Sequence, residues 1–491
     1  MSPPRATLVV SGQVVVAARA DRLLLAEAIG IAGGRVVSAG ERRDVVDGAA
    51  PGARVVDAGA AAVIPGIHDF HLHLVGMARA RRDVTLDDAT DMATVVARVA
   101  AADGRLPDGA WLTGGRWEQD VMAGDLSALR AALGERPALL TAHDGHTAWA
   151  SPAALAAAAL DVSSSIAGGR LERDANGQLT GVVRERAMLP LLAAAERLEG
   201  AGLGDALAET VEELLGWGIT GATDAGDYDA ERGIGTFARL GESFSRLWEA
   251  RAVLDGRLRV TVDLPAAAIA AAEEMGLTTG ASLAGTATLR AGWAKVYTDG
   301  TLGSRTAALF SPSTCRDGDD DDLGILRTPA DELDAILAAA RRAGIGIAAH
   351  AIGDRAAAAA LDAVQRAVPR TAGQPPDRLE HAQLVRPADR ARFAALDVTV
   401  SVQPVHLVSD RDTADACWEG RLAHAYAYRS LAAAGARLVF GTDAPIERPD
   451  PWRNLHAAVR RNAPGDGRPP WRADEALELP AALAAATLGP A

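Results

Sequence analysis

The sequence predicts an α/β fold: a TIM (β/α)₈ barrel with a small N-terminal β-sandwich-like domain and an inserted subdomain. Two observations predict the barrel. Short apolar segments that end in polar residues recur after residue 63, and stretches of helical period rich in Ala, Leu and Arg separate them. Eight buried strands that alternate with helices are typical of a closed parallel barrel. The segments span residues 63–71, 218–226, 257–265, 292–300, 344–354, 377–385, 397–406 and 436–445.

Residues 1–63 have a different pattern, because β-branched runs punctuated by glycine replace the helical stretches. The runs LVVSGQVVV, AIGIAGGRVVSAG and ARVVDAGAAAVI have the length and composition of β segments. They predict the small β domain. The barrel is then expected to use residues 64–78 and 201–491.

The first and second barrel segments lie about 150 residues apart, far more than a βα unit needs. Residues 79–200 are therefore predicted to form an inserted subdomain or lid. Within them, ALLTAHDGH is typical of a strand that leads into a turn. GRLERDANGQLTGVV is typical of a hairpin, with Asn176 and Gly177 at its turn.

Composition excludes several classes of protein. The formal net charge of −14 repels nucleic acid, and no Lys/Arg-rich tract offsets it. No apolar run reaches the roughly 20 residues of a membrane span, and the N-terminal alternation favours a strand over a signal peptide. The two cysteines, Cys315 and Cys417, are far apart and form no disulfide framework or metal motif. We therefore expect a cytoplasmic protein, with a homodimer left open.

Lys295 is the only lysine in the chain, and all the other residues counted as Lys or Arg are arginines. One explanation is a codon bias against lysine that has left a single lysine by chance. The other is that position 295 needs an amine that can lose its proton and react. A guanidinium cannot do this, because it stays protonated.

Polar side chains stand at the carboxyl ends of the predicted strands, where TIM barrels place their chemistry. His71 and His73 are two apart on one strand, so they face the same side and can reach one metal ion. Imidazole and carboxylate ligands suit Zn²⁺, and also Mn²⁺, Fe²⁺ or Ni²⁺. The set is large enough for one or two ions, and a carboxylated Lys295 could bridge two. The strand-end residues are His71, His73, Asp224, Lys295, Asp299, His350, His381, His406 and Asp443.

The motifs PGIHDFHLH, WAKVYTDGTLGSRTA, AAHAIGDRA, LEHAQLV and GTDAP stand in this order along the chain. With them the chain resembles the amidohydrolase superfamily, and more narrowly the amidohydrolase 3 branch, which includes N-substituted formamide deformylases. DGHTAWASPAAL and GQLTGVVRERA also match that branch. The resemblance extends from about residue 5 to residue 491.

The resemblance implies roles for the matching residues. His71 and His73 would hold the more buried metal, and carboxylated Lys295 would bridge it to a second one. His350 and His381 would hold that second metal. Asp443 would contact the first metal and act as general base and acid.

The function that this implies is hydrolysis of a non-peptide C–N bond in an amide, formamide or related small molecule, by a metal-activated hydroxide. Asp443 would take a proton from that hydroxide and pass it to the leaving amine. Two alternatives stay open: a mononuclear deaminase-like hydrolase, and a metal-binding barrel without catalysis. The substrate itself is not encoded in any motif.

Further residues are candidates for substrate binding or support. Each has a structural alternative: packing for Trp117, a local turn network for the pair in HDGH, and a structural role for the histidine in QPVH. The candidates for substrate binding are Trp117, Asp144, His146, Arg305 and His406. Asp224 and Asp299 are expected to support the site from behind the metal ligands. His68 is expected to face away from it, and Arg355 could cap a helix.

The C-terminus departs from the resemblance. In the family, the helix that resembles RADEALELPAALAAATLGPA is usually followed by strands that return to the N-terminal sheet, and here the sequence stops at Ala491. We therefore expect the N-terminal sheet to expose an edge.

Overall fold

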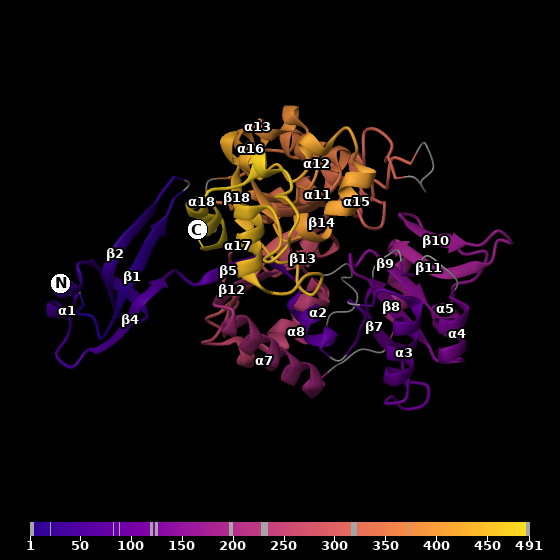
Figure 1. Ribbon diagram of the computed structural model, residues 1–491, viewed down its shortest axis with the longest axis horizontal. Coiled ribbons are helices and arrows are strands. Elements are labelled where there is room, and N and C mark those ends of the chain that lie inside the picture. Colours follow the sequence, from indigo (N-terminus) through magenta and orange to yellow (C-terminus); the bar gives the residue numbers. More distant parts are fainter. Residues whose placement is uncertain are drawn as a thin grey trace.

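Three β-sheets lie in a row in this computed structural model (Figure 1). The N-terminal sheet stands at one end, an eight-stranded parallel sheet at the centre, and a six-stranded sheet at the other end. The structure describes residues 4–19, 21–81, 83–87, 89–117, 121–122, 126–195, 200–226, 234–315, 322–371 and 373–487.

The central sheet confirms all eight predicted strand segments. Its neighbours pair in parallel and follow the chain order, from β5 through β12 to β18. Its strands are β5 (Ile67–Leu72), β12 (Ile219–Asp224), β13 (Arg259–Pro265), β14 (Leu289–Tyr297), β15 (Ile347–Ala351), β16 (Asp377–His381), β17 (Val398–Val402) and β18 (Arg437–Phe440). Most of their side chains are buried, which explains why they read as apolar runs.

The segment after β18 connects the last strand of the sheet to the first. The N–H of Asp443 donates to the carbonyl of His71 (2.7 Å), and the N–H of His73 donates to the carbonyl of Ala444 (2.7 Å). Glycine at 441 permits this close approach, because a Cβ there would lie 2.5 Å from the Cβ of His71. The sheet is therefore nearly closed into a barrel, and its closure places Asp443 beside the two histidines.

Helices surround the barrel and also cover the inserted sheet (Figure 1). Local chemistry sets their ends. In α11, for example, Asp331 and Glu332 in the first turn and Arg341 and Arg342 in the last turn complement the helix dipole, and Gly344 ends the helix in a left-handed conformation. The α-helices are α1 (Arg42–Asp47), α2 (Leu74–Ala80), α3 (Met92–Asp103), α4 (Ser127–Leu133), α5 (Pro152–Ala157), α6 (Leu189–Ala194), α7 (Gly200–Gly216), α8 (Glu242–Glu249), α9 (Arg251–Leu254), α10 (Ile269–Glu274), α11 (Ala330–Ala343), α12 (Asp354–Arg366), α13 (Pro387–Ala395), α14 (His406–Ser409), α15 (Arg411–Cys417), α16 (Tyr428–Ala433), α17 (Pro451–Arg460) and α18 (Leu479–Thr487). Short 3₁₀ helices are η1 (Arg186–Met188), η2 (Gly235–Leu240), η3 (Ala266–Ala268), η4 (Leu422–His424) and η5 (Ala473–Glu475). None of the helices in the described ranges is both long and apolar enough to cross a membrane.

The N-terminal region forms one sheet in the order β3-β2-β1-β4, not two facing sheets. Val15 and Ala18 of β1 join the buried cluster of the barrel, which anchors the sheet to it. Strand β4 lies at an edge of the sheet and is mostly exposed. The strands are β1 (Leu8–Ala18), β2 (Leu23–Ala32), β3 (Arg35–Gly40) and β4 (Arg54–Val63).

The six-stranded sheet lies within the residues that we assigned to an insertion. Its order is β10-β11-β9-β8-β7-β6, and β10 and β11 form the predicted hairpin. Gly177 lies in the turn of this hairpin with φ +78°. The strands are β6 (Val84–Thr85), β7 (Leu112–Trp117), β8 (Ala138–Ala142), β9 (Thr147–Ala150), β10 (Gly169–Arg173) and β11 (Leu179–Glu185). A separate buried cluster packs this sheet against α3 and α4.

The two cysteines are joined by a disulfide bond, which the sequence pattern did not predict. Cys315 lies in the loop that follows β14, and Cys417 ends α15. The bond closes a loop with a sequence separation of 102 residues. It is a single crosslink between two barrel loops, not a framework that holds the fold.

We expect Cys417→Ser to lower the free energy of unfolding by about 2–4 kcal/mol, because a crosslink over a long loop restricts the unfolded chain. Urea unfolding of the variant and the parent would measure this. Dithiothreitol should bring the parent to the level of the variant and leave the variant unchanged. An identical urea midpoint for the oxidised parent and the variant would contradict the prediction.

Candidate metal centre

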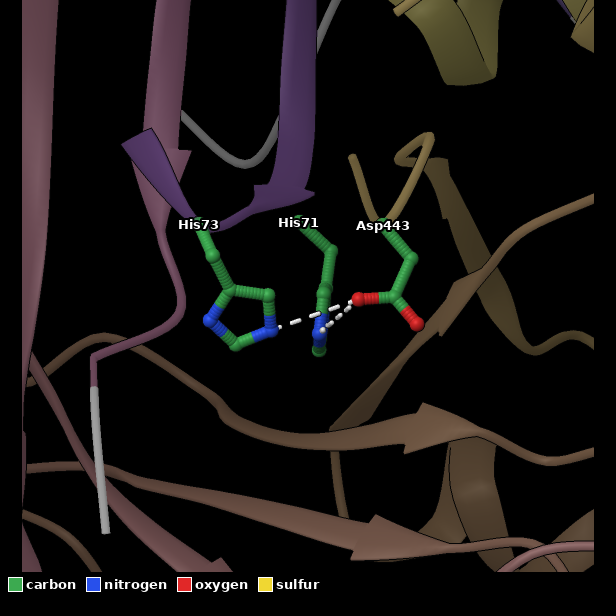
Figure 2. A group of neighbouring side chains, drawn as sticks. All are labelled: His71, His73 and Asp443. Atoms are coloured by element: carbon green, nitrogen blue, oxygen red, sulfur yellow. Dashed lines mark ion pairs between the residues drawn. The ribbon is translucent and has the colours of Figure 1, made fainter. Parts of the chain in front are cut away.

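His71, His73 and Asp443 form the first of two ligand groups at the carboxyl end of the barrel (Figure 2). His71 is in β5, His73 follows it, and Asp443 follows β18 with φ +59°. Oδ1 of Asp443 lies 3.4 Å from Nε2 of His71 and 3.3 Å from Nε2 of His73. The three side chains can therefore approach a single cation, as the His-x-His pattern predicts.

His381, His406 and the same Asp443 form the second group. His381 ends β16, and His406 begins α14. Their rings stack with centroids 6.0 Å apart, and Nε2 of His406 lies 3.7 Å from Oδ2 of Asp443. Asp443 therefore presents one carboxylate oxygen to each group. We had placed His406 among the substrate-binding candidates, whereas its position also suits a metal ligand.

His350 and Lys295 lie nearby, although His350 belongs to neither group. The ring of His350 is 4.5 Å from that of His381, measured between centroids. Lys295 is 3% exposed on β14, and its Nζ lies 5.1 Å from the ring centroid of Tyr297. Burial lowers the pKa of Lys295, against the opposing effect of carboxylates such as Glu380. This direction favours the neutral amine that carboxylation requires.

The nitrogen atoms of this cluster fit a cation. Among the described residues, both ring nitrogens of His350, Nδ1 of His381 and Nε2 of His406 are buried without a hydrogen-bond partner. Nδ1 of His350 is 3.2 Å from Oδ1 of Asp299, but the two are not in hydrogen-bond geometry. Unsatisfied buried nitrogens are costly, and a metal ion would satisfy them. Imidazole nitrogens beside a carboxylate are a donor set that suits Zn²⁺.

Asp299 and Asp224 support the loops behind these ligands. Asp299 accepts hydrogen bonds from the N–H groups of Ala308, Ile352 and Gly353, and burial raises its pKa to about 7. Asp224 accepts hydrogen bonds from the N–H groups of Leu74 and Gly226. Both carboxylates therefore hold backbone segments that adjoin the candidate ligands.

The inserted sheet brings His146 to the barrel. Nδ1 of His146 lies 3.0 Å from Oε2 of Glu185, and its ring is 5.1 Å from the ring of His350. Arg327 donates to the same Glu185 oxygen (2.7 Å), and the hydroxyl of Thr306 donates to the other (2.6 Å). Burial opposes ionisation of Glu185, but His146 and Arg327 outweigh it and lower its pKa. His146 is thus held by a buried carboxylate that also binds two barrel residues.

The other predicted pocket residues have different surroundings. Asp144 accepts a hydrogen bond from the hydroxyl of Thr301 (2.8 Å), so it links the insertion to the barrel. Trp117 is 1% exposed and donates to the carbonyl of Leu140 (2.9 Å), which places most of its ring in the core. Arg305 has φ +56° and lines a cavity at the mouth.

Two residues occupy structural positions. His68 hydrogen-bonds the hydroxyl of Thr223 (3.1 Å), and neither ligand group includes it. Arg355 lies in the first turn of α12, where its N–H donates to the carbonyl of Ala308 (3.1 Å).

Two cavities meet at the ligand groups, and six residues line both of them. One cavity, of about 710 Å³, includes His406 in its wall, and we call it the His406 cavity. The other, of about 540 Å³, includes Lys295, and we call it the Lys295 cavity. The shared residues are Asp144, His146, His350, His381, Asp443 and Ile446. A substrate with its reacting bond at Asp443 could therefore extend in two directions.

Comparison with known proteins agrees with this geometry. The profile of the amidohydrolase family matches residues 54–491, which is more than half of the chain. The chain belongs to the amidohydrolase family.

Relatives of this amidohydrolase span most of its length. It is 26% identical over 480 residues to the protein LONG AFTER FAR-RED 3 of Arabidopsis thaliana, covering 96% of this chain and 80% of that protein. It is 25% identical over 500 residues to N-substituted formamide deformylase of Arthrobacter pascens, covering 95% of this chain and 85% of the deformylase. A crystal structure of an uncharacterised metal-dependent hydrolase from Pyrococcus horikoshii superposes with a TM-score of 0.74 at 26% identity, covering 98% of this chain and 92% of the hydrolase.

Our sequence reasoning missed Glu380, which supports the first ligand group of this amidohydrolase. Oε2 of Glu380 lies 2.6 Å from Nδ1 of His71, and Arg378 pairs with Oε1 (2.9 Å). Burial opposes its ionisation, but Arg378 and His71 outweigh it and lower the pKa of Glu380. A carboxylate on Nδ1 fixes the ring so that Nε2 faces the metal side. Its position immediately before His381 was the one available signal.

We expect Glu380→Gln to weaken metal binding by about 10- to 100-fold, because the orienting carboxylate of His71 is lost. Competition with a chromogenic chelator would measure the dissociation constant. Glu274→Gln is the control, since Glu274 is exposed and pairs only with Arg239 among the described residues. Equal affinity in Glu380→Gln and Glu274→Gln would show that Glu380 does not position the ligand.

Proposed function

We propose that this amidohydrolase is a metal-dependent enzyme that hydrolyses a non-peptide C–N bond in a small amide, formamide or related compound. One observation carries the proposal: Asp443 presents an oxygen to each of two histidine groups at the barrel mouth. A scaffold that only binds metal has no need of a shared carboxylate there. The name of the deformylase supports cleavage of a formamide, and the name of the Pyrococcus hydrolase supports metal-dependent hydrolysis.

The ligands fall into two sets in this proposal. His71 and His73 would hold one cation, and His381, with His350 or His406, would hold a second. Lys295, as a carbamate, would bridge them. A bound divalent cation, with Zn²⁺ as the favoured ion, would act as a Lewis acid and lower the pKa of water.

Asp443 would move the proton that the reaction needs. Its carboxylate accepts a proton from the attacking water and delivers it to the amide nitrogen. Without that proton the amine is a poor leaving group. His146, which Glu185 holds and whose ring lies 5.1 Å from the ring of His350, would orient the carbonyl group.

Metal analysis joined to a substrate panel tests the proposal. The purified protein would be stripped with a chelator, reloaded with Zn²⁺, Mn²⁺, Fe²⁺ or Ni²⁺, and assayed against N-formyl, N-acyl and ureido compounds. We expect hydrolysis that depends on the metal and releases an amine. Two metal equivalents support the binuclear form, and one equivalent would favour the mononuclear deaminase-like hydrolase. A metal-loaded protein that is inert across the panel would overturn the proposal and favour a non-catalytic barrel.

A further inference from the structure

The two cavities that meet at Asp443 differ in the chemistry of their walls. Carboxylates dominate the His406 cavity, where Arg305 is the only Arg or Lys among the described wall residues. These carboxylates are Asp144, Asp410, Asp412, Asp415, Glu419, Asp443 and Glu447. The wall of the Lys295 cavity includes the apolar side chains of Val75, Leu106, Trp111, Leu139, Leu192 and Pro445, together with the charged Arg79, Asp83 and Glu242.

Two carboxylates in the His406 cavity have neutral donors as their hydrogen-bond partners. Asp410 accepts from the amide of Gln383 (3.1 Å) and the hydroxyl of Tyr426 (2.6 Å). Glu447 accepts from the hydroxyl of Ser409 (2.6 Å), the residue before Asp410. Within the described ranges, neither carboxylate has an Arg or Lys partner at ion-pair distance. The basic groups that act on them are histidines: Nε2 of His143 is 3.6 Å from Glu447, and His406 lowers the pKa of both carboxyl groups.

Gln383 adds a second, independent observation. Its side chain is 3% exposed in the wall of the His406 cavity, and its Oε1 is buried without a hydrogen-bond partner. The bond from Nε2 to Asp410 fixes which end of the amide is the acceptor. An unsatisfied acceptor in the same cavity wall as these carboxylates is suited to a ligand that donates several N–H groups.

We propose that the substrate carries an ammonium or guanidinium group that binds at Asp410, Glu447 and Gln383, and an apolar group that occupies the Lys295 cavity. The scissile C–N bond then lies between them, beside Asp443. This inference rests on the proposed function and narrows it to amides with a cationic end and an apolar end. A cation supplies positive charge to the two carboxylates and a donor for Oε1 of Gln383, whereas a neutral group of the same size supplies no charge.

Matched substrates test the inference. N-phenylacetyl-1,4-diaminobutane and N-phenylacetyl-pentylamine differ by an ammonium group in place of a methyl group, and 6-aminohexanoyl-benzylamide places the charge on the acyl side. We expect the better of the two charged amides to exceed the neutral one in kcat/KM by at least about 10-fold. Asp410→Asn combined with Glu447→Gln should reduce this ratio to below about 3-fold. Asp334→Asn combined with Glu274→Gln, which removes two exposed carboxylates, should keep the ratio of the parent.

Binding without turnover separates this inference from the proposed function. Butylguanidinium is a permanent cation that cannot ligate a metal as a neutral amine, and n-butanol is its neutral counterpart. Calorimetry on the metal-loaded protein should show that butylguanidinium binds more tightly, and that the double variant loses the difference.

If the protein hydrolyses amides but prefers neither charged substrate, the inference fails while the proposed function stands. If no amide is hydrolysed but the cation binds as expected, the proposed function fails and the cation site stands. Equal binding of the cation and the alcohol would overturn the site.

Discussion

Asp443→Asn is expected to lower kcat by about 10²- to 10⁴-fold, which is the range that general acid–base catalysis contributes. The side chain is 6% exposed, and its two oxygens face His71 and His73 on one side and His406 on the other. An asparagine side chain has the same size and keeps one oxygen that can bind a metal ion, but it cannot take up the proton. The variant should therefore bind substrate and fail to protonate the leaving amine.

Metal content distinguishes loss of the proton acceptor from loss of the cation. The assay compares kcat and KM of the parent and Asp443→Asn, with metal measured on the same samples. We expect KM to change by less than about 10-fold while kcat falls, because the proton transfer that is lost takes place only in the transition state. The variant Asp334→Asn serves as the surface control. Full activity of metal-loaded Asp443→Asn would exclude the carboxylate as base and acid.

The barrel was predictable from sequence, because buried parallel strands appear as short apolar runs and polar ends mark the catalytic face. The convergence of side chains from the ends of β5 and β18 was predictable for the same reason, since both strands end on that face. The disulfide between Cys315 and Cys417 was not, because 102 residues separate the two and only the fold brings α15 against the loop after β14.

The contact between Glu380 and His71 was not predictable from the sequence because of a local backbone conformation. Side chains alternate along a strand, so Glu380 and His381 should face opposite sides. His381 has φ +73°, which breaks that alternation. Glu380 therefore reaches Nδ1 of His71 (2.6 Å), while the ring of His381 also lies 4.9 Å from the ring of His71. A left-handed residue other than glycine leaves no mark in composition or spacing.

The insertion was predictable as an element but not in its contacts. His146 and Asp144 were candidates because their motif follows a predicted strand. Glu185 was not, because its partners Arg327 and Thr306 lie more than a hundred residues away in sequence. Such networks depend on how two sheets pack, and no single segment encodes that. The grouping of His406 with His381 likewise depends on the packing of neighbouring elements, because His381 ends β16 and His406 follows the adjacent strand β17.

Lys295→Arg is expected to abolish most metal binding and to lower activity by at least about 10²-fold. The side chain of Lys295 is 3% exposed on β14, and its burial lowers the pKa of the amine. The neutral amine can form a carbamate, whereas a guanidinium stays charged and cannot. The variant would also place a permanent positive charge beside His71, His350 and His381. This charge would repel a cation at the proposed site.

The design of this test separates the carbamate from simple packing. Lys295→Glu introduces a carboxylate on a side chain that is shorter than carboxylated lysine, so this variant should retain part of the bound metal. Lys295→Met has no carboxylate and should retain little. Circular dichroism and thermal unfolding would show whether each variant keeps the fold. Labelled bicarbonate should give a carbamate signal in the parent that is absent in all three variants. If Lys295→Arg bound metal and hydrolysed amides as well as the parent, the only lysine of this chain would have no part in the site.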